Sequence, residues 1–120
     1  MSVDGKKYIG EMVARARAAQ KKIEFATQKE VDDICARITR AGTTEVFARK
    51  IAELAVQESG MGRADSKFAK MMVKVKGVYA QLKDAKTVGI IETDEKLGLV
   101  KIAKPVGVIG ALIPVTNCEA

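Results

Sequence analysis

Apolar residues in the first 86 positions recur every three or four residues, which is the spacing of one face of an α-helix. This pattern predicts four helices. The first begins after Asp4, whose carboxylate is suited to cap free amide groups, and runs to about Glu24. The face that it is expected to bury carries Ile9, Met12, Val13, Ala16, Gln20 and Ile23.

A second helix is predicted from a capping box. In Thr27-Gln28-Lys29-Glu30 the Thr side chain and the Glu carboxylate can each satisfy a free amide group at a helix start. Gly42 is expected to end this helix in the left-handed conformation that glycine adopts readily. The predicted core face comprises Val31, Ile34, Cys35 and Ile38.

Two further helices follow. Thr43 or Thr44 is expected to cap the third, which ends near Gly60 and Gly62 and packs against the second helix. Its predicted apolar face is Phe47, Ile51, Leu54 and Ala55. Asp65 or Ser66 opens the fourth helix, where an apolar stripe recurs at alternating spacings of four and three. That stripe is Phe68, Met72, Val75, Tyr79 and Leu82, and it is interpreted as core rather than as a cofactor site.

From Thr87 the pattern changes to β-type runs. Residues 87–93 and 97–103 flank the turn-like Asp94-Glu95-Lys96 and predict a β-hairpin. Both faces of the second strand carry apolar residues, so burial on both sides is expected. Pro105 should end the ladder because it has no amide hydrogen to donate.

Residues 106–114 form an apolar run without polar alternation, which is typical of a central strand in a parallel sheet covered by helices. Such a strand needs neighbouring strands and crossover helices, and few residues remain to supply them. The expected fold class is therefore α/β, with this chain as the opening segment of a larger protein.

The content of cysteine and histidine limits the kinds of catalytic and metal site that the chain can form. The chain has two cysteines and no histidine, so it can build neither a four-ligand zinc site nor a histidine-dependent triad, and no metal site is predicted. Both cysteines are expected to be buried thiols. The sequence contains no secretory signal and no run of apolar residues long enough to span a membrane, so the cytoplasm is the expected compartment and a membrane is not an expected partner.

The net charge of +6 raises the question of an acidic partner. The densest basic stretch lies in the first helix, where Tyr8 is the only nearby aromatic residue. A solvated helix face is favoured over nucleic-acid binding because base stacking lacks aromatic partners. An independent basic helical module that binds an acidic partner remains the alternative function. The basic residues concerned are Lys6, Lys7, Arg15, Arg17, Lys21 and Lys22.

Candidate chemistry lies at the end of the apolar run, where ligands bind in open parallel sheets. Gly107 and Gly110 lie within the predicted strand and so do not form a dinucleotide fingerprint. Pro114 should end the ladder, and Thr116 and Asn117 offer a hydroxyl and an amide for a cofactor ribose or an oxyanion. A plain turn or a cap for a following helix is an equally open interpretation.

These residues carry a resemblance to a known family. The stretch Lys104-Pro105-Val106-Gly107-Val108-Ile109-Gly110-Ala111-Leu112-Ile113-Pro114-Val115-Thr116-Asn117 resembles the start of the cofactor-binding domain of the aldehyde dehydrogenase superfamily. Its Pro-x-Thr-Asn ending is similar to the coenzyme A-acylating branch, which includes acetaldehyde, propionaldehyde and succinate semialdehyde dehydrogenases. Segments 18–22, 58–62 and 86–91 agree with that branch.

The resemblance implies an oxidoreductase that converts an aldehyde and CoA to acyl-CoA with NAD or NADP, or runs the reverse reaction. Residues 1–86 would be the helical part of a Rossmann-like cofactor domain, residues 87–103 the hairpin of an oligomerisation region, and residues 104–120 the first strand of the dinucleotide-binding sheet. A homo-oligomer and a small aldehyde substrate are implied. The cofactor-binding residues implied are Leu112, Ile113, Pro114, Val115 and Thr116.

The implied catalytic residues are Asn117 and Thr116. In the non-acylating branch the oxyanion-stabilising Asn follows the Pro by two positions, where gapless matching places Thr116; here the Asn comes one residue later, as in the acylating branch. The family's nucleophilic Cys lies far downstream, so neither Cys35 nor Cys118 is expected to serve, and the chain alone should be inactive. A docking role for the first helix in an enzyme shell is a further alternative, opposed by the short connection to the second helix.

Overall fold

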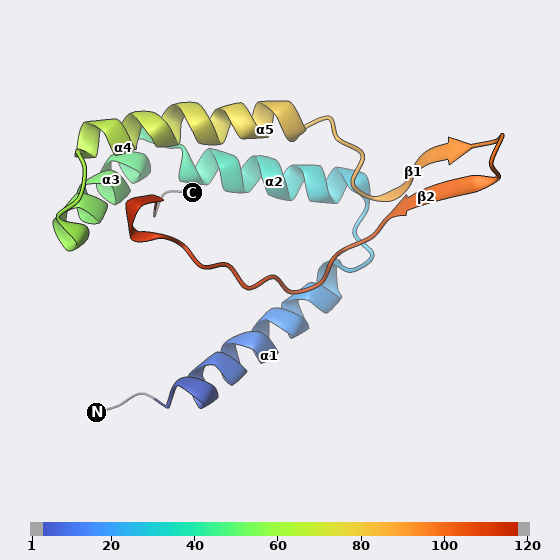
Figure 1. Cartoon of the computed structure of the whole chain (residues 1–120), viewed down its shortest axis with the longest axis horizontal. Coiled ribbons are helices and arrows are strands. Elements are labelled where there is room, and N and C mark those ends of the chain that lie inside the picture. Colours follow the sequence, from blue (N-terminus) through green and yellow to red (C-terminus); the bar gives the residue numbers. More distant parts are fainter. Residues whose placement is uncertain (1–3, 118–120) are drawn as a thin grey trace. The chain divides into compact units, whose positions relative to one another are not determined.

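The computed structural model describes residues 4–117 and shows five α-helices, a π-helical segment, a two-stranded sheet and a short 3₁₀ turn within them (Figure 1). The described chain forms two compact units. One consists of residues 4–28 and 86–110, and the other of residues 29–85 together with residues from 111 onward.

Helix α1 (Gly5–Ile23) opens the first unit and confirms the predicted first helix. Asp4 is its N-cap, and its carboxylate accepts hydrogen bonds from the amides of Lys6 at 3.1 Å and Lys7 at 3.2 Å. This is the arrangement that satisfies the free amide groups of a first turn. None of the residues of α1 is buried, so the expected burial of its apolar face is not seen in the described chain.

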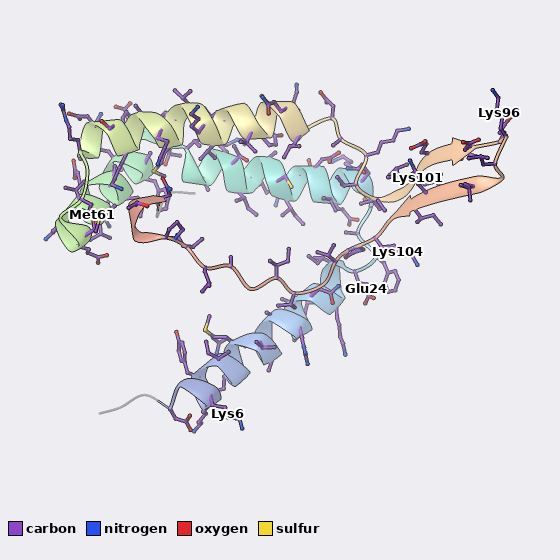
Figure 2. All side chains as sticks on the ribbon, in the orientation of Figure 1. Lys6, Glu24, Met61, Lys96, Lys101 and Lys104 are labelled. Carbon is purple, nitrogen blue, oxygen red and sulfur yellow. The ribbon has the colours of Figure 1, made fainter. Side chains whose placement is uncertain are left out.

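The predicted hairpin is confirmed, with strands β1 (Gly89–Asp94) and β2 (Leu99–Ala103) paired antiparallel. The register runs from Gly89 opposite Ala103 to Asp94 opposite Leu99, and a bulge interrupts the pairing between Ile90 and Glu92. The Asp94 carboxylate accepts hydrogen bonds from the amides of Lys96 and Leu97, each at 3.0 Å. Figure 2 places Lys96 at the tip of the hairpin.

Strand β2 ends at Ala103, two residues before Pro105, as predicted. Its side chains are exposed on both faces, so the expected burial on both sides is not met within the described residues. A contact that the sequence pattern did not predict joins this unit: the Gln28 side-chain oxygen accepts hydrogen bonds from the amides of Thr87 at 2.8 Å and Val88 at 3.0 Å.

The apolar run 106–114 does not form the predicted strand. Residues 104–114 have neither helical nor strand structure, and the Leu112 side chain is 100% exposed. The physical reason is that a strand is defined by its partner, and the two strands of the described chain, β1 and β2, pair with each other. The sequence of the run is strand-like, but its ladder has no neighbour among residues 4–117.

The second unit is helical, with α2 (Gln28–Gly42) and α3 (Glu45–Ser59) followed by one long helical stretch (Figure 1). That stretch comprises α4 (Ala64–Lys70), the π-helical η1 (Met71–Val75) and α5 (Lys76–Leu82). Helix α3 packs against α4 and η1, whereas the sequence predicted α2 as its main partner. The buried hydrophobic residues are Ala48, Ala52, Ala55 and Met71.

The core of this unit therefore differs from the predicted one. Ala55 of α3 is buried as predicted, whereas Phe47 and Leu54 are exposed. Ala48 and Ala52 are buried instead, because small side chains allow α3 and α4 to approach closely. The predicted core face of α2 is largely exposed, and Cys35 on that face is an exposed free thiol, which corrects the expectation of a buried one. Cys118 lies outside the described residues.

The predicted helix ends hold with three corrections. Thr44 is the N-cap residue of α3, as predicted, but its side chain makes no cap hydrogen bond and donates to the Ala41 carbonyl at 3.3 Å instead. Helix α2 does end at Gly42, but Gly42 is not left-handed. The next residue, Thr43, is buried and donates its hydroxyl to the Thr39 carbonyl at 2.7 Å, which closes the helix in place of a glycine cap. Helix α4 begins at Ala64, one residue before the earliest predicted start, with Arg63 at the N-cap and no side-chain cap bond.

The turn between α3 and α4 is built by Ser59 and two glycines. Gly60 is left-handed, with φ of 66°, and its amide donates to the Val56 carbonyl at 2.8 Å. The Ser59 hydroxyl donates to the Ala55 carbonyl at 2.5 Å and accepts from the Met61 amide at 3.1 Å. Met61 marks this bend in Figure 2. Residues 58–62, one of the segments that carry the family resemblance, thus reverse the chain so that α4 packs on α3.

Candidate functional site

The predicted site residues Thr116 and Asn117 lie in the 3₁₀ turn η2 (Val115–Asn117), which contacts α3. The turn is closed by a hydrogen bond from the Asn117 amide to the Pro114 carbonyl at 3.0 Å. We call residues 114–117 the site turn. The turn directly follows the apolar run, where the sequence predicted a site.

Two lysines from α4 hold the site turn. The Lys67 ammonium donates to the Thr116 backbone carbonyl at 3.2 Å, and the Lys70 ammonium donates to the side-chain oxygen of Asn117. Residues three apart on a helix lie on the same face, so both lysines reach the turn together. The contacts join positions 49 and 47 residues apart in the chain.

Lys67 is unusual because its side chain is only 7% exposed. Lysine is rarely buried unless its ammonium group has partners, and Thr116 provides one. The aliphatic stem of Lys67 lies under the α3–α4 turn, where a Cβ added to Gly62 would stand 3.4 Å from its Cε. Gly62 is also left-handed, with φ of 78°. The turn therefore shields the stem while the ammonium reaches the site turn.

The Lys70 contact fixes the direction of the Asn117 amide. An ammonium group has three donors and no acceptor, so only the oxygen of an asparagine side chain can face it favourably. The Asn117 oxygen is thereby engaged by Lys70, and the amino group with its two donors is outside this contact. A polar donor is thus held in a defined orientation at the end of the apolar run.

The residues implied to bind a cofactor, 112–116, run into the site turn and overlap it at positions 114–116. Leu112 is 100% exposed and Ile113 is 56% exposed, and Pro114 and Thr116 are also exposed. The Val115 side chain lies outside the part that the structure describes. The segment presents apolar side chains beside a hydroxyl, a combination suited to the edge of a sugar and an aromatic base.

Sequence reasoning identified the turn residues but missed Lys67 and Lys70. Lysines in an amphipathic helix are normally solvated, and nothing local marks these two as different. The one available signal is that Lys67 stands four residues before the buried Met71 and therefore shares its helix face. The stripe predicted from Phe68 and Met72 is displaced by one position from the face that is in fact buried.

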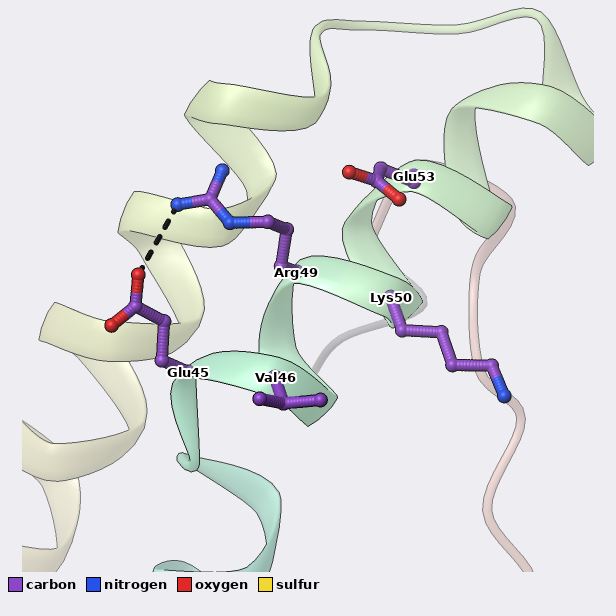
Figure 3. Close-up of a pocket in the computed structure, with 5 residues that line it drawn as sticks. All are labelled: Glu45, Val46, Arg49, Lys50 and Glu53. Carbon is purple, nitrogen blue, oxygen red and sulfur yellow. Dashed lines mark hydrogen bonds and ion pairs between the residues drawn. The ribbon is translucent and has the colours of Figure 1, made fainter.

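Apart from the site turn, the surface of α3 carries a hollow with a volume of about 340 Å³ (Figure 3). One helix supplies its whole lining, which consists of Glu45, Val46, Arg49, Lys50 and Glu53. Arg49 is engaged with Glu45 at 3.5 Å and Asp65 at 4.0 Å, and its guanidinium lies 4.4 Å from the centre of the Phe68 ring. The Glu45 contact lies within α3, whereas the contacts with Asp65 and Phe68 join α3 to α4, so the Arg49 charge serves packing between these helices.

Among residues 4–117, no three Cys, Asp or Glu side chains gather where a metal ion could be held. Within the same residues, no helix combines the length and the apolar character needed to cross a membrane.

No family model matches the sequence. The chain is 47% identical over 108 residues to a sulfoacetaldehyde dehydrogenase from an Acholeplasma species, which covers 90% of this chain and 22% of that protein. It is 41% identical over 114 residues to an acylating sulfoacetaldehyde dehydrogenase from Bilophila wadsworthia, which covers 95% of this chain and 25% of that protein.

The fold is similar to the crystal structure of an acetylating aldehyde dehydrogenase from Geobacillus thermoglucosidasius, with a TM-score of 0.69 and 37% identity over 75% of this chain and 20% of the other. The chain thus spans a quarter or less of the length of these relatives. In sequence over nearly its whole length, and in fold over most of it, the chain is similar to a part of the acylating aldehyde dehydrogenases.

Proposed function

We propose that the chain is a segment of an enzyme that converts an aldehyde and CoA to acyl-CoA with NAD or NADP, or catalyses the reverse reduction. The observation that carries this proposal is the 41% identity to an acylating sulfoacetaldehyde dehydrogenase across 95% of the chain. The alternative of a basic module for an acidic partner has no support in these relatives, and no observation in the structure favours it.

In this enzyme, residues 112–116 form one edge of the cofactor site. The exposure of Leu112 and Ile113 supports this role, since an apolar wall open to solvent can receive an adenosine and ribose. The Thr116 hydroxyl is placed to bind a ribose hydroxyl. When bound, NAD or NADP supplies the acceptor for the hydride that leaves the substrate.

Asn117 is the second contribution of the segment. Its amino group, directed away from Lys70, donates a hydrogen bond to the oxyanion that forms when a thiolate adds to the aldehyde carbonyl. Thr116 is the neighbouring candidate donor. The thiolate comes from neither Cys35 nor Cys118, because the nucleophilic cysteine of the family that the chain resembles lies far downstream of this segment.

The hairpin of β1 and β2 belongs to an oligomerisation region of a cytoplasmic homo-oligomer. Support comes from the exposure of apolar side chains on both of its faces, including Leu99, Val100 and Ile102. Exposed apolar side chains that gather on one element are typical of a surface that another polypeptide covers.

A chimera tests the enzymatic proposal. This chain replaces the matching segment of the Acholeplasma sulfoacetaldehyde dehydrogenase, and CoA-dependent reduction of NAD and NADP is measured with acetaldehyde and with sulfoacetaldehyde. We expect activity with at least one aldehyde, and a loss of roughly 10²–10³ in kcat for Asn117→Ala, the usual effect of removing an oxyanion donor. Lys74→Met, at an exposed residue of η1, is the matched control and should retain activity.

Circular dichroism and the apparent molecular mass establish that each chimera is folded. A folded chimera without activity, or an Asn117→Ala chimera with unchanged kcat, would contradict the proposed roles. The purified 120-residue chain should show no CoA-dependent NAD reduction with acetaldehyde. Turnover by this chain alone would refute the proposal that another segment supplies the nucleophilic cysteine.

A further inference from the structure

We infer that Lys70 is a positioning residue that orients the Asn117 amide, and that Lys67 anchors the backbone on which Asn117 stands. The inference rests on the proposed function, because orientation matters only if the amide donates to an oxyanion. Its structural part, the coupling of two lysines of α4 to the site turn, is measurable without any activity.

Asn117 requires an orienting partner because an asparagine side chain can rotate its amide by half a turn at little cost in solvent. In one orientation it presents two donors to the reacting oxygen, and in the other it presents an acceptor, which would repel an oxyanion. Asn117 is exposed, so packing does not decide between the two orientations. The Lys70 ammonium does decide, because it can only donate.

Lys67 acts on the backbone of the same turn. Its ammonium binds the Thr116 carbonyl at 3.2 Å, one residue before Asn117. A side chain that is 7% exposed has few alternative positions, so this contact fixes the turn relative to α4. The two lysines therefore restrain one residue in two ways, with Lys67 holding its backbone and Lys70 holding its side chain.

Positioning of this kind should affect turnover more than substrate binding. A donor that stabilises charge developing in the transition state lowers the barrier only if it is already oriented, since reorientation during the reaction costs free energy. Loss of the restraint should lower kcat by about tenfold to a hundredfold and change KM little. Lysine at position 70 can be replaced by arginine with retention of a donor, whereas methionine keeps the chain length and removes the donor.

The structural test uses nuclear magnetic resonance on the 120-residue chain. In the original sequence we expect an ordered Asn117 side-chain amide with contacts to the Lys70 side chain. Lys70→Met should shift the signals of the Asn117 side-chain amide and reduce the order of that group. Lys70→Arg should largely preserve the signals and the order, and Lys74→Met should leave both unchanged. Asn117 signals that are the same with and without the Lys70 ammonium would overturn the inference.

The kinetic test is a double-mutant cycle in the chimera. If Lys70 acts through Asn117, Lys70→Met should lower kcat in the presence of Asn117 and have no further effect after Asn117→Ala. A reduction of the same size in both backgrounds would show that Lys70 does not work through Asn117 and would overturn the positioning role. An inactive chimera of the original sequence counts against the proposed function, and the resonance measurements then decide the structural coupling by themselves.

Discussion

Gly60 provides a sharp test of the turn that places α4 against α3. Its φ of 66° lies in the left-handed region, and no atom lies within 4 Å of the position that a Cβ would occupy. Gly60→Ala therefore introduces no clash and probes the backbone alone. Gly77, in α5, is the matched site because its surroundings are equally open but its φ is not positive.

The two substitutions should have opposite effects on the free energy of unfolding. The left-handed conformation costs an L-residue roughly 1–2 kcal/mol, and the reduced entropy of the unfolded chain returns about 0.4–1 kcal/mol. Gly60→Ala should thus destabilise the helical unit by about 1 kcal/mol. Gly77→Ala should stabilise it by about 1 kcal/mol, since alanine is favoured over glycine within a helix.

Thermal unfolding followed by circular dichroism at the helical band measures both effects. For a domain of this size, about 1 kcal/mol corresponds to a shift in Tm of roughly 4–8 °C, downward for Gly60→Ala and upward for Gly77→Ala. Gly60→Asn should lose less than Gly60→Ala, because asparagine tolerates the left-handed region better. Equal shifts in the same direction for the two alanine variants would refute the assignment of Gly60 as a conformational requirement.

Three further predictions concern other parts of the second unit. The Lys29 ammonium, which donates a hydrogen bond to Asp33 at 2.6 Å, holds the pKa of Asp33 below its ordinary value. The stabilisation from this pair should therefore be present above pH 3.8 and be lost as the pH falls through the lowered pKa. Lys29→Met should return the Asp33 pKa toward 3.8 in a carboxyl resonance titration, and an unchanged value would contradict the pairing. Met71→Ala should destabilise by about 2–5 kcal/mol in urea unfolding, because Met71 is 5% exposed, whereas Val73→Ala, at a site 66% exposed, should stay within about 0.5 kcal/mol. Cys35 should react with a maleimide in the native chain nearly as fast as in urea, and protection seen by peptide mass mapping would place the thiol in the core after all.

The elements that the sequence predicted correctly are those specified by neighbouring residues. Asp4 caps α1 through contacts two and three residues away, and Asp94 builds the hairpin turn in the same local way. Such signals lie within one turn of chain, so a single sequence is enough to interpret them. The resemblance to acylating aldehyde dehydrogenases was similarly accessible, because it depended on short segments that occur in the expected order.

The features that the sequence did not predict depend on contacts between distant positions. Gln28 binds Thr87 across 59 residues, and Lys67 binds Thr116 across 49. The apolar run 106–114 shows the same limit, since its composition is that of a strand but only a neighbouring strand can make it one. The buried face of α4 is determined by its packing against the alanines of α3. The spacing of apolar residues within α4 does not contain that information.

The segment 58–62 connects a local sequence signal with contacts between distant positions. It contributed to the resemblance only as a string of residues, yet its left-handed Gly60 reverses the chain and its Gly62 leaves space beside Cε of Lys67. Lys67 in turn binds the Thr116 carbonyl, next to the residue proposed to donate to the oxyanion. In this chain, therefore, a glycine-rich turn far from the site turn in sequence is physically connected to it, because the turn places the helix whose lysines hold the site turn.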